Sequence, residues 1–176
     1  LGVLAYAASF ADGIHTSIPA PGLGALAAGL DGKESRLARA LAKLGVSADD
    51  IAVVSKHDTS TGVNERNESE LHERLASAIG REPSNPMFVI SQKTLTGHAK
   101  GGAAAFQVIG LCQVLAEGIL PPNRSLDCVM DDLAEHERLV WLREPLASGP
   151  LKAGLVTSLR FRHVAGLIAV PHPQAF

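Results

Sequence analysis

Two histidines have neighbours that could support chemistry. His57 ends the apolar run Ile-Ala-Val-Val-Ser-Lys-His and opens a hydroxyl-rich stretch, Asp-Thr-Ser-Thr. His98 lies in Lys-Thr-Leu-Thr-Gly-His-Ala-Lys-Gly-Gly, just before a long run of small and apolar residues. We expect each histidine at the C-terminal tip of a strand, the edge at which open α/β sheets place ligands and chemistry. Together with Lys93, five residues ahead of His98, they form a candidate catalytic group.

A helix is expected to start near Gly101, and it would give His98 a specific chemistry. The positive end of the helix dipole disfavours imidazolium and keeps the ring neutral. A neutral imidazole donates one N–H to a developing oxyanion without being a strong acid. Gly97, Gly101 and Gly102 leave room for a bulky substrate. Loop capping by His98 and close helix packing by the glycines explain the same local pattern equally well.

The hydroxyl residues after His57 suit an extended ligand. Thr59, Ser60 and Thr61 offer donors and acceptors in a row, which fits an amide-rich chain. Hydrogen bonds to their own loop backbone are the alternative. Lys93 and Glu68 are candidates for an ion pair that fixes the surroundings of the histidines, and each also fits a solvated surface charge.

The other histidines and both cysteines have no comparable setting. Cys112 lies in an apolar stretch and is interpreted as a core residue, and Cys128 has no base beside it in sequence. Their spacing fits neither a disulfide framework nor a metal site. The remaining histidines are interpreted as structural or surface residues: His15, His72, His136, His163 and His172.

The composition limits the class of protein. At 176 residues the chain has the length of one domain, and its net charge of −2 gives no electrostatic reason to expect nucleic acid or an anionic membrane surface. It has no apolar run of the roughly 18 residues that a spanning helix needs, and no charged-then-apolar leader. The chain opens with Leu1 rather than methionine, which favours a segment of a longer protein, with processing as the alternative.

Three stretches carry helical patterns. Ser35 is expected to cap a helix that Gly45 ends, with an apolar stripe formed by Leu37, Leu41 and Leu44. Asn67 is expected to cap a helix that Gly80 ends, with Glu70 in the capping box and an inward stripe formed by Leu71, Leu75 and Ile79. Residues 101–117 are apolar nearly all round and predict a helix buried on most sides.

Several apolar runs predict strands, and they lie over residues 1–8, 51–54, 87–90, 139–142, 151–158 and 164–170. The last three are expected to have antiparallel neighbours. Strands and helices alternate at first, and strands then follow one another. This order predicts a layered α/β domain with a mixed sheet.

The two histidine segments resemble motifs of one enzyme family. Residues 56–61 resemble the His-Gly-Thr-Gly/Ser-Thr motif of β-ketoacyl synthases, the condensing enzymes of fatty acid and polyketide synthesis, and residues 93–102 resemble their Lys-x-x-x-Gly-His motif. Residues 11–13 and 19–21 match the opening of the same half-domain, and residues 157–164 resemble its closing glycine–phenylalanine loop. The match spans essentially the whole chain. The detailed sequence of these motifs is most similar to the ketosynthase of type I fatty acid synthases.

The resemblance implies a fold and a mechanism. Residues 1–176 would form the C-terminal half of a thiolase-like fold, with a five-stranded mixed sheet and helices on both faces. His57 and His98 would hydrogen-bond the malonyl thioester oxygen and stabilise the enolate formed by decarboxylation. Lys93 would lie near them with Glu68 as its ion-pair partner. The nucleophilic cysteine of the family belongs to the N-terminal half.

The resemblance also implies what the chain binds. Thr59 and Thr61 would contact a phosphopantetheine arm, and Phe161 would gate the acyl chain with its backbone N–H in the acyl oxyanion hole. Phosphopantetheine would be delivered by acyl carrier protein, with no bound cofactor and no metal. The other expected partners are the N-terminal ketosynthase half and a homodimer or larger synthase assembly, in the cytoplasm.

Three departures from the family pattern favour a rival interpretation. Neither Cys112 nor Cys128 replaces the missing nucleophile, and Asp58 stands where many relatives have glycine. Arg160 and Arg162 occupy glycine positions, where bulky charged residues obstruct a tight gating loop. The rival is a non-catalytic ketosynthase remnant or scaffold half-domain, and a third candidate is a malonyl-thioester decarboxylase. In each case we expect the isolated chain to expose apolar surface and to be poorly soluble or self-associating.

Overall fold

The computed structural model describes residues 2–11, 36–160 and 164–175. Of Arg160 it describes the backbone alone. Several sequence predictions lie outside the described residues: the Ser35 cap, the motif at residues 19–21, Phe161, Arg162, His15 and His163.

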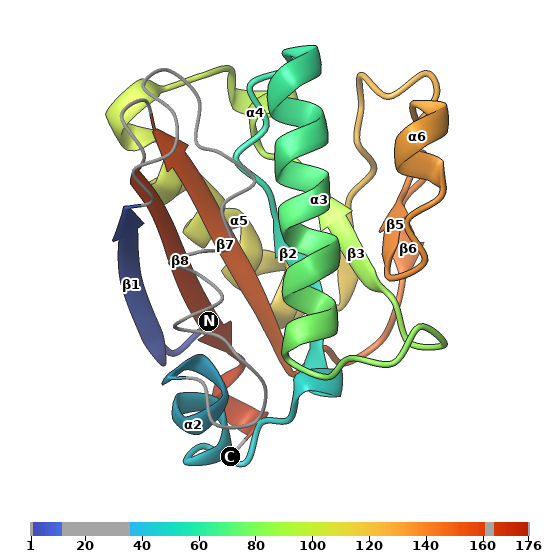
Figure 1. The fold of residues 1–176 in the computed structure, drawn as a ribbon. Coiled ribbons are helices and arrows are strands. Elements are labelled where there is room, and N and C mark those ends of the chain that lie inside the picture. Colours follow the sequence, from blue (N-terminus) through green and yellow to red (C-terminus); the bar gives the residue numbers. More distant parts are fainter. Residues whose placement is uncertain (1, 12–35, 161–163, 176) are drawn as a thin grey trace.

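A six-stranded mixed sheet forms the centre of the molecule, in the order β1-β8-β7-β2-β3-β5 (Figure 1). Its strands are β1 (Tyr6–Ala11), β2 (Ile51–Ser55), β3 (Met87–Ile90), β5 (Leu139–Trp141), β7 (Ala153–Arg160) and β8 (Val164–Pro171). β8 lies antiparallel to β1 and β7, and β2 lies parallel to β7 and β3. The predicted mixed sheet is confirmed, with one strand more than the five expected.

The pairing of β5, which lies in the strand predicted over residues 139–142, corrects one prediction. This strand pairs parallel with β3, where an antiparallel neighbour was expected. Two parallel neighbours need a long crossover between them. Here the crossover runs from β3 through α5 and then back to the sheet edge through α6 (Asp131–Ala134). On this path β4 (Ile119–Leu120) pairs with β6 (Leu146–Ala147), which follows β5, in a separate two-stranded sheet.

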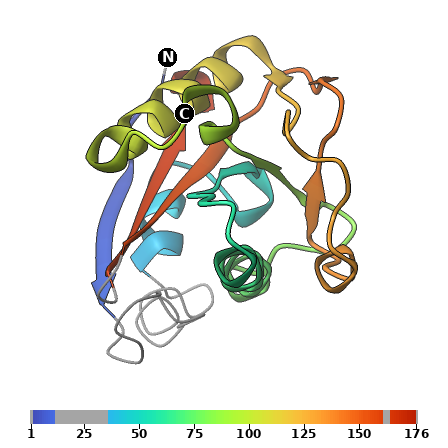
Figure 2. The ribbon, with the colours of Figure 1, turned by 90° about the horizontal axis from the view of Figure 1, so that it is seen from above.

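Helices cover both faces of the central sheet, as expected (Figure 2). α2 (Arg36–Ala42) and α3 (Gly62–Ala78) lie on one face, and α5 (Ala103–Glu117) lies on the other. The predicted stripes of α2 and α3 are buried in one core cluster, which contains Leu37, Leu41, Leu71, Leu75 and Ile79. Gly45 and Gly80 end these helices with φ of 68° and 83°, values that favour glycine.

The start of α3 differs from the prediction. The helix begins at Gly62 with Thr61 as its N-cap, so Asn67 lies inside it. The reason is that Asn64 and Glu68, one helical turn apart, both point inward and are buried. Sequence patterns assign polar residues to a helix start or an exposed face, whereas here they form a buried polar stripe.

α5 lies where it was predicted, and its burial is lower than expected. A short 3₁₀ turn, Lys100–Gly102, precedes it, and Gly118 ends it with φ of 64°. Phe106 and Ile109 are 46% and 64% exposed on one side of the helix. The apolar surface of this helix therefore exceeds what the sheet covers. In the described part of the chain no helix is both long and apolar enough to cross a bilayer.

Candidate active site

The C-terminal ends of two parallel neighbours, β2 and β3, bring the histidines together. His57 follows β2 by two residues, and His98 follows the short helix α4 (Lys93–Thr96) beyond β3. The two imidazole rings lie with centroids 5.5 Å apart and planes at 84°, edge to face. At this distance, one nitrogen of each ring can contact the same small group placed beside the two rings.

A backbone hydrogen bond defines the tautomer of His98. The N–H of Lys100 donates to Nδ1 of His98 over 3.0 Å. A nitrogen that accepts carries no proton, so the ring proton of the neutral imidazole sits on Nε2. His98 is exposed and thus presents one N–H donor away from its own loop.

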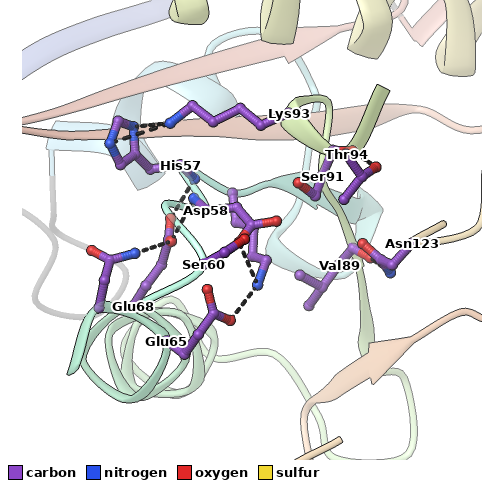
Figure 3. Close-up of polar contacts among 12 residues, drawn as sticks. His57, Asp58, Ser60, Glu65, Glu68, Val89, Ser91, Lys93, Thr94 and Asn123 are labelled. Atoms are coloured by element: carbon purple, nitrogen blue, oxygen red, sulfur yellow. Dashed lines mark hydrogen bonds and ion pairs between the residues drawn. The ribbon is translucent and has the colours of Figure 1, made fainter. Parts of the chain in front are cut away.

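His57 is held at both its backbone and its ring. Its backbone N–H donates to the carboxylate of Glu68, and the next N–H, of Asp58, donates to the other carboxylate oxygen over 2.8 Å (Figure 3). The ammonium of Lys93 lies 3.1 Å from Nδ1 and 3.3 Å from Nε2 of the ring. Burial first, and then the positive charge of Lys93, lower the pKa of His57 to about 4. The imidazole is therefore neutral at pH 7.

Glu68 is the structural centre of this site and differs from the expectation. It is 1% exposed, and besides the two backbone N–H groups it accepts from Asn64 over 3.2 Å and from the Thr157 hydroxyl over 3.3 Å. It forms no ion pair with Lys93, whose ammonium is beside His57 instead. Burial raises the pKa of Glu68 to about 7, although the positive charge of Lys56 and the N–H donors favour the carboxylate.

A second buried histidine extends this network. Nε2 of His72 lies 2.8 Å from the hydroxyl of Thr157 on β7. The hydroxyl has one proton, which it donates to Glu68, so it accepts from Nε2–H of His72. Burial lowers the pKa of His72 to about 3, so this ring is neutral and structural, as interpreted from the sequence.

Gln107 is a site-supporting residue that the sequence patterns missed. It is fully buried on α5, and its amide nitrogen lies 3.0 Å, 2.8 Å and 3.0 Å from the carbonyl oxygens of Ser55, Lys56 and Thr157. It thereby links the end of β2 and the residue after it to the middle of β7. A glutamine between the apolar residues of the helix was the available signal, although the helix has a second one, Gln113, that is exposed.

The chain matches known proteins both in sequence and in structure. The model of the β-ketoacyl synthase C-terminal domain matches residues 1–127. The chain belongs to this family. Fatty acid synthase 2 of Mycosarcoma maydis is 37% identical over 173 residues, covering 97% of the chain and 4% of that protein. Fatty acid synthase alpha subunit stcJ of Emericella nidulans is 35% identical over 177 residues, covering 99% of the chain and 11% of that subunit.

Solved ketosynthases share the fold. The noncanonical ketosynthase FabY from P. aeruginosa is 29% identical with a TM-score of 0.80, covering 99% of this chain and 26% of that one. The oxazolomycin ketosynthase domain OzmH KS7 of Streptomyces albus JA3453 has a TM-score of 0.79 at 16% identity, covering 97% and 29% of the two chains. The chain therefore has the expected thiolase-like fold, and it spans only a small part of the fatty acid synthases that it matches.

Two of the remaining predicted site residues, Thr59 and Thr61, lie in the loop that follows His57. Thr59 is half-buried, and Thr61 is exposed at the start of α3 with no side-chain bond to the helix N–H groups. Phe161 lies outside the described residues. Cys112 packs against the core cluster beneath α5, whereas Cys128 is exposed. Two charged residues that the sequence patterns did not single out, Lys56 and Glu65, lie beside Asp58.

The buried groups predict a pH-dependent stability. Between about pH 4.5 and 6.5, His57 and His72 are protonated in the unfolded chain and neutral in the folded one, because their folded pKa values are about 4 and about 3. Glu68 opposes this, because its folded pKa of about 7 keeps it protonated where the unfolded carboxyl is ionised. The unfolded chain then binds about one proton more, so the free energy of unfolding should rise with pH by about 1.4 kcal/mol per unit. Urea unfolding at several pH values measures the slope.

A substitution at His72 tests this assignment. His72→Gln keeps a donor for Thr157 and removes one titrating group, so the slope between pH 4.5 and 6.5 should flatten to near zero. His136→Gln, at a half-buried histidine beside Trp141, is the control and should leave the slope as it is. A slope that is unchanged in the His72 variant would show that this residue does not titrate as proposed.

Proposed function

We propose that this chain is the C-terminal half of a β-ketoacyl-[acyl-carrier-protein] synthase of fatty acid biosynthesis, which catalyses the decarboxylative Claisen condensation of malonyl with an acyl thioester. The observation that carries the proposal is the pair of imidazoles 5.5 Å apart, with His98 presenting Nε2–H. His57 is neutral at pH 7 because of its lowered pKa. Such preorganised donors are what an enolate oxygen requires.

The proposed reaction uses both halves of the fold. The malonyl carboxylate leaves as CO₂, and the electron pair of the broken C–C bond becomes an enolate whose thioester oxygen accepts hydrogen bonds from His57 and His98. The enolate carbon then attacks the acyl thioester on a cysteine of the N-terminal half, a C–C bond forms, and the cysteine thiolate leaves. Burial, and then the ammonium of Lys93 beside the ring, keep the imidazole of His57 neutral. Thr59 and Thr61 are proposed to contact the phosphopantetheine arm that acyl carrier protein delivers.

Reconstitution tests this function. The chain alone, and the chain joined to an N-terminal ketosynthase half, are supplied with acyl and malonyl carrier-protein thioesters, and CO₂ and 3-oxoacyl product are measured. We expect both products only from the joined protein. Product-free joined protein, even after Arg160→Gly and Arg162→Gly, would support the remnant or scaffold instead. CO₂ from the chain alone without condensation would identify a decarboxylase.

The uncovered side of α5 supports a partner half. Phe106 and Ile109 lie one helical turn apart, and no described element covers this side of the helix (Figure 2). Beside the start of α5, at Ala104, a hollow of about 350 Å³ is lined mostly by small residues of β1, β7 and β8. We propose that the N-terminal half packs here. The assembly would be a dimer or a larger synthase in the cytoplasm, and the matches to fatty acid synthases, of which the chain covers 4% and 11%, support a larger synthase.

The same surface predicts self-association of the isolated chain. Sedimentation velocity should show oligomers for the unmodified chain, and Phe106→Glu with Ile109→Glu should shift it toward monomer because charge disfavours burial of this face. Ile119→Glu changes a comparably exposed residue on β4, 47% exposed, and should leave the oligomers in place. A monomeric unmodified chain would contradict the prediction.

A further inference from the structure

The described residues with strained backbone gather at the two site histidines. Three non-glycine residues among those described have positive φ: Asp58 at 49°, Ser60 at 57° and Lys100 at 48°. Each lies within three residues of His57 or His98 in sequence. A left-handed backbone is costly for residues with a Cβ and persists only where surrounding contacts hold it. Contacts around Asp58 must therefore hold its backbone in the left-handed conformation.

The left-handed residue directly follows the backbone groups that Glu68 binds. The consecutive N–H groups of His57 and Asp58 both donate to this one carboxylate, in a concave arrangement that the backbone angles of His57 set. The φ of Asp58 turns the chain immediately beyond these two N–H groups and directs the Asp58 side chain toward Lys56, on the other side of His57 in sequence. The residues on both sides of His57 are thus joined, and the position of its backbone depends on that link.

A buried cation holds the side chain of Asp58. The ammonium of Lys56 lies 3.5 Å from Oδ1 of Asp58 and 2.6 Å from Oε2 of Glu65, and the side chains of Lys56 and Asp58 are each 8% exposed. Figure 3 shows Asp58, Ser60 and Glu65 close together beside the histidine loop. Burial by itself lowers the pKa of Lys56, but three nearby carboxylates raise the pKa by more than burial lowers it. The side chain therefore keeps its positive charge.

We propose that Lys56, Asp58 and Glu65 form a charged clamp that holds the left-handed backbone at Asp58 and thereby positions His57 for the reaction. Glycine at position 58 would adopt this conformation without strain, whereas Asp58 is held in it by the clamp. These three residues act through His57 and are positioning residues. The expected effect of the clamp on turnover rests on the proposed function. Its effect on the conformation of the His57 loop rests on geometry alone.

Hydrogen exchange tests the clamp without any substrate. The exchange of the His57 and Asp58 amides is followed by mass spectrometry on peptides covering residues 55–61. Lys56→Met and Asp58→Ala should each speed this exchange about tenfold, because the left-handed residue loses its compensation. Asp58→Gly should change it less than threefold. Arg138→Met, which removes a different ion pair of α3, with Glu73, is the control and should leave the loop unchanged.

A rescue separates positioning from general stability. The triple variant Lys56→Met, Asp58→Gly, Glu65→Gln has no buried charge in the clamp and a residue that adopts φ of 49° without strain. We expect slow exchange at His57 and Asp58 to return, and the NMR titration of His57 to stay near its low pKa, whereas Lys56→Met shifts it upward. If Lys56→Met does not fold, a folded and protected triple variant supports the clamp.

Any of three results would overturn the clamp. They are unchanged amide exchange in Lys56→Met, a triple variant as unprotected as Lys56→Met, and a triple variant that fails to fold. In the joined ketosynthase, loss of the clamp should lower kcat more than it raises KM, because it displaces His57 rather than the carrier-protein contacts. Loss of protection without any turnover in the unmodified protein would leave the clamp standing and contradict the proposed function alone.

Discussion

Replacing His98 with alanine in the joined ketosynthase should lower the rate of malonyl decarboxylation about 100- to 1000-fold. In this structure the Nδ1 of His98 is occupied by the Lys100 N–H, so Nε2–H is the donor that the substitution removes. The enolate oxygen would then depend on His57 alone. The rate of CO₂ release from malonyl carrier protein, measured under saturating substrate, reports this step separately from condensation.

The chain offers a matched control for this substitution. His172 has the same local hydrogen bond as His98, because its Nδ1 accepts the N–H of Gln174 two residues ahead over 3.1 Å. It directly follows Pro171, the last residue of β8. Because β8 runs antiparallel to β7, and β7 runs parallel to β2, this end of β8 lies at the opposite edge of the sheet from the His57 loop. His172→Ala should therefore reproduce any local loosening and leave CO₂ release near the unmodified rate. Equal losses in the two variants would argue against His98 as an oxyanion donor.

His57→Ala should reduce CO₂ release to a similar extent, and the double variant should lose less than the product of the two. Two donors that hold one oxygen act as a unit, and removal of either disrupts the shared geometry. The ring contact at 5.5 Å makes the two positions interdependent. Fully multiplicative losses would show that the imidazoles serve different groups.

Glu68→Gln should cost both stability and activity. The amide nitrogen of glutamine cannot accept a hydrogen bond, so the N–H of His57 or Asp58 loses its acceptor in a fully buried site. We expect the free energy of unfolding to fall by about 2–3 kcal/mol, the range for a buried hydrogen bond to a charged group together with an unpaired donor. Urea denaturation of the isolated chain measures this loss.

The activity loss in Glu68→Gln follows from displacement of His57. A shift of about 1 Å at a reacting group typically costs about 100-fold in rate, and we expect a kcat effect of that order in the joined ketosynthase. Glu73→Gln is the control: this residue lies on the same helix and accepts from Arg138 over 2.9 Å, away from the histidines. It should lower stability without a comparable effect on kcat. A Glu68 variant with normal kcat would show that the loop is positioned by other contacts.

Several features of the chain were predictable from sequence because they depend on local patterns. The strand over residues 87–90 and the ends of α2 and α3 at Gly45 and Gly80 follow from apolar runs and left-handed glycines. The mixed α/β class follows from the order of elements. The proximity of His57 and His98 follows because parallel neighbouring strands end at the same edge of a sheet.

Other features depend on contacts between residues far apart in the sequence, and here the patterns were insufficient. Glu68 was predicted to pair with Lys93, but its buried position opposite the His57 loop makes two backbone N–H groups its partners. The start of α3 at Gly62 and the role of Gln107 depend on buried polar contacts, which hydrophobic periodicity does not register.

The sequence by itself determined the family, the layered architecture and the identity of the two histidines, because motifs and periodicities are properties of neighbouring residues. Only the tertiary structure decided the lowered pKa of His57, the partners of Glu68 and the strained backbone at Asp58. These depend on which groups are buried together, and burial determines both the hydrogen-bond partners and the pKa of each group.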